Sequence, residues 1–341
     1  MTGAVIRRGL LLAATGVSLY LVAPALLEVF GSFPQLADLS PLWFVAMLLL
    51  QVGSYACMWA VQKLALRTES WGPVITSQLA ANAFGRIVPG GVAAAGALQY
   101  AMLVRGGVPA ASAASGMTAS SVLVFGILLA LPLFALPAII GGAPVDRGLE
   151  RAAIAGALVF VLIFAGGVLS FAFDRPLELV GRAVQSVRNR LRRSRKPLRE
   201  LPRRLLRERN VVRHTLGARW WEALLYASGR WVLDYLTLLA ALTAVGADPR
   251  PSLVLLAFTA AQALGTLPLT PGGLGFVEAG LTATLALAGV SAGDAVVATL
   301  AYRLVSYWLP IPAGGLAALL HRRRYGSVET PAEEAPSAGG G

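Results

Sequence analysis

The chain has 341 residues, of which 56% are hydrophobic and only 13% are charged. A soluble globular domain carries about 25% charged residues, so this composition excludes an ordinary soluble protein and favours one solvated by a bilayer. The formal net charge is +12, but residues 174–219 hold fifteen of the 29 basic residues and only four acidic ones. A basic block between apolar runs is typical of a cytoplasmic loop, and no nucleic-acid motif accompanies it, so we expect no nucleic-acid partner.

Residues that support catalysis or metal binding are scarce in the sequence. Cys57 is the single cysteine, and His214 and His321 both lie in basic stretches, where we interpret them as solvated loop residues. Gly-rich phosphate loops, His-Glu-x-x-His motifs and Gly-x-Ser-x-Gly motifs do not occur. We therefore expect no catalytic residue, no metal site and no cofactor, and we expect that the chain is not an enzyme.

The apolar runs, taken in chain order, predict a polytopic all-α membrane protein. Six of them approach or exceed the about 20 residues that a helix needs to cross the hydrocarbon core. These runs cover residues 9–27, 42–62, 108–140, 152–173, 220–245 and 294–320. Pro132 and Pro137 are expected to kink or break the third run. The distribution of basic residues predicts a multi-pass protein of the cell (inner) membrane with both termini in the cytoplasm.

Two further apolar stretches are each interrupted by a Pro-Gly-Gly motif. The first combines residues 71–88 and 92–104, and the second combines 252–269 and 274–290. The motifs themselves are Pro89, Gly90 and Gly91, and Pro271, Gly272 and Gly273. Neither arm of the first stretch crosses a membrane comfortably, so a hairpin that enters and leaves by the same face fits better. Its bend at membrane depth must be buried in protein or line a cavity.

The two interrupted stretches form a weak internal repeat. Superposing the Pro-Gly-Gly motifs gives an offset of 182 residues, whereas Gln78 and Gln262 are 184 residues apart and so lie two residues out of register. Three full spans lie between the hairpins, so the second hairpin is expected to point the opposite way. Such an inverted repeat places discontinuous helices near the midplane of many transporters. Chance similarity between apolar segments is the alternative, and the count fails if one hairpin is a single span.

The resulting fold prediction is a single membrane domain over residues 1–326. It has about six full spans and two re-entrant hairpins, or about eight to ten membrane segments in all. The first half covers about 41–140 and the second about 220–320, with the basic cytoplasmic loop at 174–219. Residues 327–341 are rich in Pro, Glu, Ala and Gly and are expected to be a disordered cytoplasmic tail.

Several ionisable residues lie inside the predicted membrane segments, where they tend to face a cavity or a partner. Arg230 and Asp234 are four residues apart on one helix face, which favours a self-neutralising structural ion pair. Arg86 and Arg303 come from different halves, and a guanidinium binds phosphate bidentately.

The predicted head-group site therefore combines charged and polar residues with the two bends: Arg86, Pro89, Gly90, Gly91, Pro271, Gly272, Gly273, Glu278, Tyr302 and Arg303. In the alternative interpretations Arg303 pairs with Glu278, or Arg86 extends to the membrane surface.

Residues 269–278 read LTPGGLGFVE and residues 302–310 read YRLVSYWLP. With these motifs the chain resembles the lysylphosphatidylglycerol synthetase transmembrane-region family of flippase-like, UPF0104-type membrane proteins, over about residues 5–322. The resemblance implies translocation of a decorated lipid between leaflets. It does not imply synthesis, because the synthetase activity of bifunctional members lies in a soluble C-terminal domain that we do not expect here.

Many members carry Gly-Glu and Arg after the first Pro-Gly, whereas residues 92–97 are Val, Ala and Gly, so aminoacyl-phosphatidylglycerol is not assumed as the substrate.

Two functional hypotheses follow. The first is a flippase for a lipid or lipid-linked intermediate with a phosphate-bearing head group, whose partners are anionic or phosphate-bearing membrane lipids. The alternative is a non-transporting scaffold, whose loop at 174–219 recruits a cytoplasmic glycosyltransferase or lipid-modifying enzyme.

Overall fold

The computed structural model describes residues 39–88, 91–134, 173–191, 217–265 and 273–326, together with single residues between 162 and 210. Within these ranges the regular structure is helical, and no strand occurs in them. Several sequence predictions lie outside the described residues. They are the first span at 9–27, most of the span at 152–173, His214, Pro137, the bend residues Pro89, Gly90, Pro271 and Gly272, and the tail at 327–341.

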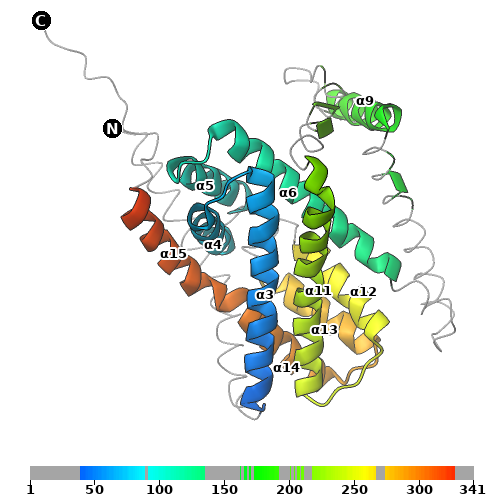
Figure 1. Cartoon of the computed structure of the whole chain (residues 1–341). Helices are drawn as coiled ribbons and strands as arrows, with labels where there is room; N and C mark the ends of the chain where they lie inside the picture. Colours follow the sequence, from blue (N-terminus) through cyan, green and yellow to red (C-terminus); the bar gives the residue numbers. More distant parts are fainter. Residues whose placement is uncertain are drawn as a thin grey trace, which may run out of the picture.

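Two antiparallel helices, α3 (Pro41–Leu66) and α11 (Trp220–Ala244), form the centre of the molecule (Figure 1). They occupy the runs predicted at 42–62 and 220–245. Glycines let them approach closely, since a Cβ added at Gly53 would lie 3.1 Å from Leu233 and one at Gly229 would lie 3.0 Å from the Cys57 sulfur. Small residues at helix contacts are the usual means of close packing in a membrane, where lipid is as apolar as the side chains.

Each interrupted apolar stretch folds as a pair of short antiparallel helices. The first pair is α4 (Trp71–Ile87) and α5 (Gly91–Arg105), and the second is α12 (Pro251–Gly265) and α13 (Phe276–Leu287). The longest, α4, has 17 residues and rises about 26 Å, which is less than the about 30 Å of the hydrocarbon core. The Pro-Gly-Gly motifs therefore do separate two short helices, as expected from the sequence.

The helices of the first pair, α4 and α5, contact each other at both ends. At its base a Cβ at Gly106 would lie 2.5 Å from Pro73, so the end of α5 lies beside the start of α4. At its tip a Cβ at Gly91 would lie 2.5 Å from the carbonyl oxygen of Gly85. Glycine is thus required at the tip because two backbones touch there.

The two remaining apolar runs form long helical segments, each of which contains a turn that is not α-helical. Helix α6 (Ala110–Ala130) tightens into the 3₁₀ turn η1 (Leu131–Phe134), which contains Pro132, as a proline-induced break predicts. At the end of the chain, α14 (Ala292–Arg303) passes through the π-helical turn η4 (Leu304–Trp308) into α15 (Pro310–Tyr325). Pro310 lacks an N–H, and the backbone N–H of Leu309 reaches back five residues to the carbonyl of Leu304, 2.9 Å away.

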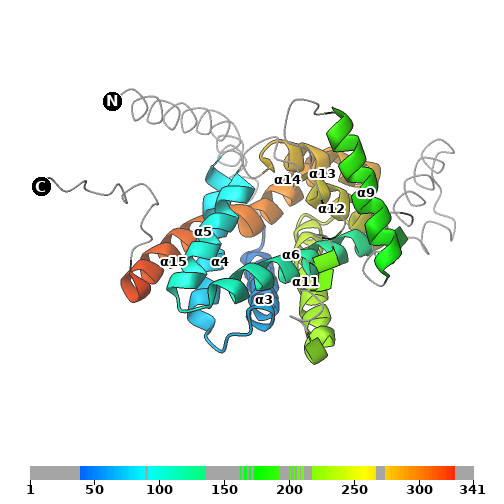
Figure 2. The same cartoon turned by 90° about the horizontal axis from the view of Figure 1, so that it is seen from above.

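The two helix pairs lie at opposite ends of the central helices. In Figure 1 α4 and α5 lie in the upper half, beside the end of α3, whereas α12 and α13 lie in the lower half, beside the end of α11. From above, α4, α5 and α15 form one group and α12, α13 and α14 another, so the long helix that contains η4 joins the two groups (Figure 2). Helix α15 runs antiparallel to α4, with Gly314 against Leu79 and Ala83, and Tyr325 against Gly72.

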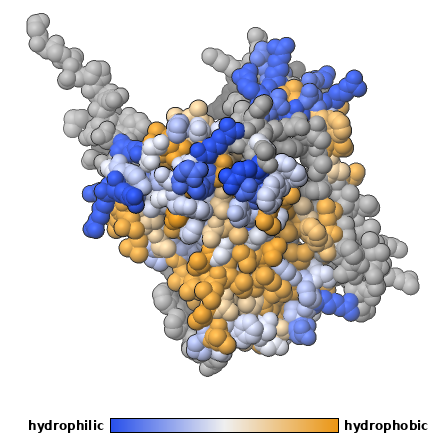
Figure 3. Space-filling view, in the orientation of Figure 1, coloured by the Kyte–Doolittle hydropathy of each residue, from blue (hydrophilic) through white to orange (hydrophobic). Residues whose placement is uncertain are grey.

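The surface carries an apolar band. Hydrophobic residues cover the middle of the face in Figure 3, and hydrophilic ones gather at its upper end, where α9 (Asp174–Leu191) and the end of α15 lie. Large apolar side chains such as Leu42, Leu49 and Leu316 are more than 60% exposed. Three helical segments, Pro41–Leu66, Ala110–Phe134 and Ala292–Tyr325, are long and apolar enough to span a bilayer. Such a surface is expected of a multi-pass membrane protein.

The structure overturns one interpretation of the sequence. His321 is not a solvated loop residue: it is 1% exposed, and its Nδ1 lies 2.7 Å from the hydroxyl of Thr76 in α4. The reason is that α15 packs along α4 up to its last turn, so position 321 faces α4. The neighbouring Arg322, Arg323 and Arg324 face outward and are exposed, as the sequence suggests for this basic run.

Candidate functional site

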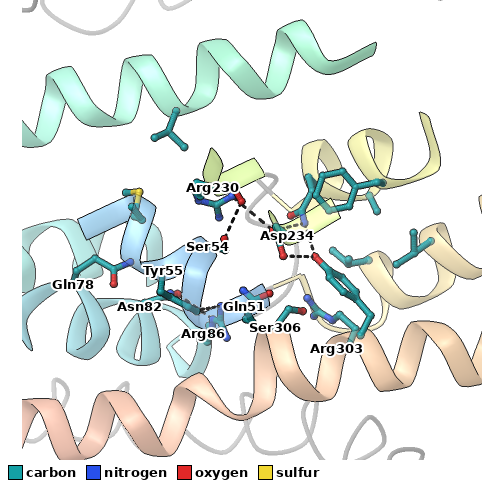
Figure 4. A pocket seen from close by; sticks show the side chains of 18 residues that line it. Gln51, Ser54, Tyr55, Gln78, Asn82, Arg86, Arg230, Asp234, Arg303 and Ser306 are labelled. Carbon is teal, nitrogen blue, oxygen red and sulfur yellow. Dashed lines mark hydrogen bonds and ion pairs between the residues drawn. The ribbon is translucent and has the colours of Figure 1, made fainter. Parts of the chain in front are cut away.

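A cavity of about 300 Å³ lies where the two helix pairs and the central helices meet (Figure 4). Its walls come from α3, α4, α6, α11, α12, α13, α14 and η4, so both halves of the chain contribute. Polar side chains from both halves of the chain converge on it. The polar lining residues are Gln51, Ser54, Tyr55, Gln78, Asn82, Arg86, Arg230, Asp234, Gln262, Tyr302, Arg303 and Ser306.

Arg86 is held at the first-half side of the cavity by three elements. Its Nε donates to the side-chain oxygen of Asn82 at 3.0 Å, and its Nη2 donates to the hydroxyl of Tyr55 at 3.2 Å. Its Nη1 donates to the backbone carbonyl of Tyr307, and the Tyr307 hydroxyl donates back to the carbonyl of Arg86 at 3.1 Å. The side chain therefore turns into the molecule and does not extend to the membrane surface.

Asp234 organises the second-half side. It pairs with Arg230 at 3.7 Å, so the expected ion pair forms. The same carboxylate accepts hydrogen bonds from the Tyr302 hydroxyl at 3.1 Å and from the Gln262 amide at 3.3 Å. The Gln262 amide also donates to the Tyr302 hydroxyl at 2.8 Å. The pair is thus part of the cavity wall. The sequence of α11 alone indicates only a structural ion pair.

Arg303 is anchored by Glu278. Its Nε donates to one carboxylate oxygen at 2.6 Å, and the other oxygen accepts the backbone N–H of Gly275 at 2.8 Å. Glu278 thereby caps the start of α13 and ties the second bend to α14. The structure therefore forms the Arg303–Glu278 pair that the sequence offered as the alternative, and Glu278 is not among the residues that line the cavity.

The ring of Tyr307 joins the arginines of the two halves. The guanidinium carbon of Arg86 lies 4.8 Å from its centroid and that of Arg303 lies 4.1 Å away, both within cation–π range. Tyr307 is 3% exposed and lies in the π turn η4. Single-turn π segments occur frequently at functional sites, because they re-aim side chains within a helix.

Three buried atoms on the cavity-lining residues have no hydrogen-bond partner: Gln51 Oε1, Arg230 Nη1 and Arg303 Nη2. A buried polar group left without a partner costs about 1–3 kcal/mol, and more if it is charged. Two of these atoms are guanidinium donors, which suit the oxygens of a phosphate or carboxylate. The cavity therefore has spare capacity for an anionic ligand.

The charges around the cavity favour the same class of ligand. Three guanidinium groups line it, from Arg86, Arg230 and Arg303, against one lining carboxylate, Asp234. Glu278 neutralises part of Arg303 from behind. Among the described residues no group of His, Cys, Asp or Glu is arranged to hold a metal ion.

The bend residues that the structure describes have packing roles. Gly91 touches the backbone of Gly85, and Gly273 has a φ of +74°, a conformation that favours glycine. Neither lines the cavity, so a direct contact between the bends and a ligand stays a prediction. Sequence reasoning missed Tyr55, Asn82 and Tyr307, although polar residues in apolar helices are a signal that could have pointed to the first two.

The comparisons with known proteins agree with this architecture. The family model described as "Lysylphosphatidylglycerol synthase TM region" matches residues 10–314. Two curated proteins of Methanothermobacter thermautotrophicus, each named "UPF0104 membrane protein", are 36% identical over 89 residues and 31% identical over 96 residues. These matches cover 26% and 28% of this chain, and 26% and 27% of the relatives, so the chain spans about a quarter of their length. No solved structure matches the chain.

Proposed function

The chain belongs to the lysylphosphatidylglycerol synthase transmembrane-region family, and we propose that it is a lipid transporter that carries a phosphate-bearing head group between leaflets through the central cavity. The observation that carries this proposal is the convergence of Arg86, Arg230 and Arg303 on one cavity, where two guanidinium nitrogens have no hydrogen-bond partner. Guanidinium groups bind phosphate oxygens in a planar, bidentate geometry. The substrate is a phospholipid or lipid-linked intermediate, and no catalytic step is assigned.

In this proposal the two helix pairs are re-entrant hairpins of an inverted repeat. Their short helices, their positions at opposite ends of the molecule and the antiparallel course of α3 and α11 support it (Figure 1). The tip of the first pair carries Arg86, and the start of α13 at the second tip holds Arg303 through Glu278. In inverted-repeat transporters such discontinuous helices meet at a substrate site near the midplane.

The end of the molecule at the base of α4 and α5 is proposed to be cytoplasmic. Lys63, Arg67 and Arg105 lie at this end, as does the exposed run of arginines in the last turn of α15. Among the described charged residues, the opposite end carries only Asp248 and Arg250 in its loop and Asp294 in the first turn of α14. The positive-inside rule then directs the termini to the cytoplasm, in a cell (inner) membrane.

The transport step follows from the way the two halves are joined. The phosphate would bind Arg303 Nη2 and Arg230 Nη1, neither of which has a hydrogen-bond partner, and it would compete with Asp234, which lies 3.7 Å from Arg230 Nη1. Tyr307, which contacts Arg86 and Arg303, couples the two tips to the π turn. Rocking of the two groups of helices about this turn would expose the head group alternately to each side, while the acyl chains stay in lipid.

The test is transport of a fluorescent phosphatidylglycerol analogue in proteoliposomes, followed by dithionite quenching of the outer leaflet. Arg303→Ala and Arg86→Gln/Arg303→Gln should abolish transport, and Arg303→Lys should reduce it at least about tenfold, because lysine keeps the charge but loses the planar fork. Arg250→Gln is the matched control, since this exposed arginine lies outside the cavity. Normal transport by Arg303→Ala in protein that elutes as wild type would reject the assignment.

One observation favours the scaffold alternative. Leu179 of α9 and Phe173 just before it are about 60% exposed, close to the basic residues of the 174–219 loop, a surface that a cytoplasmic enzyme could bind. Deleting residues 188–209 distinguishes the two functions. A scaffold would lose its function, whereas the transporter should retain measurable lipid movement in the same proteoliposomes.

A further inference from the structure

A second cavity, of about 380 Å³, lies at the end of the molecule where α3 finishes and α4 and α11 begin. Three basic residues from three segments line it, namely Lys63, Arg67 and Arg219, and Glu69 is the acidic residue among its lining. Trp71 and Tyr226 add aromatic walls. The cavity therefore combines an excess of positive charge with amphipathic aromatic side chains.

The tryptophans near this cavity indicate its depth in a membrane. Trp71 is 46% exposed, and Trp220 and Trp221, at the start of α11, are 58% and 56% exposed. Tryptophan gathers at the level of the lipid head groups, because its ring is apolar while its N–H favours water. The cavity thus lies at the membrane–water interface, where the phosphates of lipids are found.

The basic side chains of the cavity pair with carboxylates that a ligand phosphate would replace or join. Lys63 pairs with Glu69 at 3.1 Å, but the Glu69 side chain is 97% exposed, and such surface pairs contribute little. The Lys63 ammonium also lies 4.8 Å from the centroid of the Trp71 ring. Arg219 is 63% exposed, and its guanidinium donates to both carboxylate oxygens of Glu222, at 2.7 Å and 2.6 Å. This bidentate pair fixes the guanidinium at the rim, where a ligand phosphate would share it with Glu222.

The second cavity continues the central one along the same two helices. On α3, Met58 lines the central cavity and Ala60 and Lys63 line the second. On α11, Arg230 lines the central cavity and Tyr226, one turn earlier, lines the second. One helical turn rises about 5.4 Å, so a head group that leaves one cavity is within reach of the other.

We propose that this second cavity is a phosphate-binding site that holds the head group of an anionic membrane lipid at the interface. The binding site stands by itself, and its role as the loading or release station of the central cavity rests on the proposed transport function. Lys63 and Arg219 supply the charges, and the aromatic walls exclude part of the water.

The probe is phosphatidic acid, titrated against the purified full-length chain and followed by native mass spectrometry. Diacylglycerol with the same acyl chains lacks the phosphate and should not bind. Lys63→Gln/Arg219→Gln should weaken the binding of one phosphatidic acid about 30-fold, because each basic side chain near anionic head groups contributes roughly fivefold. Arg322→Gln/Arg323→Gln removes the same charge from exposed positions outside the cavity and should bind as wild type.

A conservative pair keeps the test decisive if the first variant folds poorly. Lys63→Arg/Arg219→Lys retains both charges and should restore binding. Glycerol 3-phosphate distinguishes a lipid from a soluble phosphate ester. Its binding with the same dependence on Lys63 and Arg219, without binding of phosphatidic acid, would overturn the lipid assignment.

Equal loss of affinity in the glutamine variant and in the exposed-arginine control, or no loss in either, would also overturn the site. Transport in proteoliposomes is a separate measurement. Absence of transport by the wild-type chain together with loss of phosphatidic acid in the glutamine variant would reject the transport function and leave this site in place.

Discussion

At the scale of single residues, the cavity is defined by side chains that each have two tasks. Glu278 caps α13 and orients Arg303, and Tyr307 holds Arg86 while it contacts Arg303. Asp234 balances Arg230 and accepts from Tyr302 and Gln262. A substitution at any of these positions therefore changes both packing and charge, and stability has to be measured beside transport.

Asp234→Asn tests this double role. The amide leaves Arg230 without its counter-charge and directs N–H donors toward a site where Gln262 already donates, so we expect a loss of about 2 kcal/mol in stability. Thermal unfolding in detergent should show a midpoint several degrees lower. Asp248→Asn, at an exposed position, is the control and should unfold as wild type. An unchanged midpoint for Asp234→Asn would mean that the carboxylate does not stabilise this wall of the cavity.

At the scale of elements, the contact between α15 and α4 places the tip of the first helix pair. A Cβ at Gly314 would clash with Ala83 and with the carbonyl of Leu79. Gly314→Leu should therefore separate the helices and cost about 1–3 kcal/mol, the usual price of overpacking. Because Arg86 and His321 lie on either side of this contact, lipid transport should fall together with stability.

Gly315 is the matched control for this prediction, since a Cβ there would meet nothing within 4 Å. Gly315→Leu should leave the unfolding midpoint and transport unchanged, because this position is exposed. The prediction is wrong if Gly314→Leu and Gly315→Leu behave alike in thermal unfolding.

At the scale of the whole molecule, the sidedness of the helix pairs decides whether the repeat is inverted. Single cysteines introduced at Glu69, Arg105 and Asp248, on a Cys57→Ser background, report which side each position faces. We expect positions 69 and 105 to react with an impermeant maleimide only from the cytoplasmic side, and position 248 only from the outside. All three positions are exposed. Labelling of position 105 from the outside would show that the first pair crosses the membrane only once, and the count behind the inverted repeat would then fail.

Much of the architecture could be predicted from the sequence, because a bilayer constrains it strongly. The runs at 42–62 and 220–245 became α3 and α11, and each Pro-Gly-Gly motif separated two short helices, since length and apolarity alone select helices that suit a membrane. Three residues that line the cavity, Arg86, Tyr302 and Arg303, could also be predicted from the sequence. A charged or polar group in an apolar run is costly to bury in a membrane and therefore stands out.

The grouping of these residues around one cavity depends on long-range packing and could not be predicted. Asp234 bonds to Tyr302 across 68 residues of sequence, and Arg86 bonds to Tyr307 across 221, and such pairings depend on how helices from both halves pack. His321 became buried for the same reason: its own segment is basic and polar, but α15 lies against α4. The helices, their membrane setting and the charged residues within them follow from local composition and length. Their partners depended on long-range packing, which no local pattern encodes.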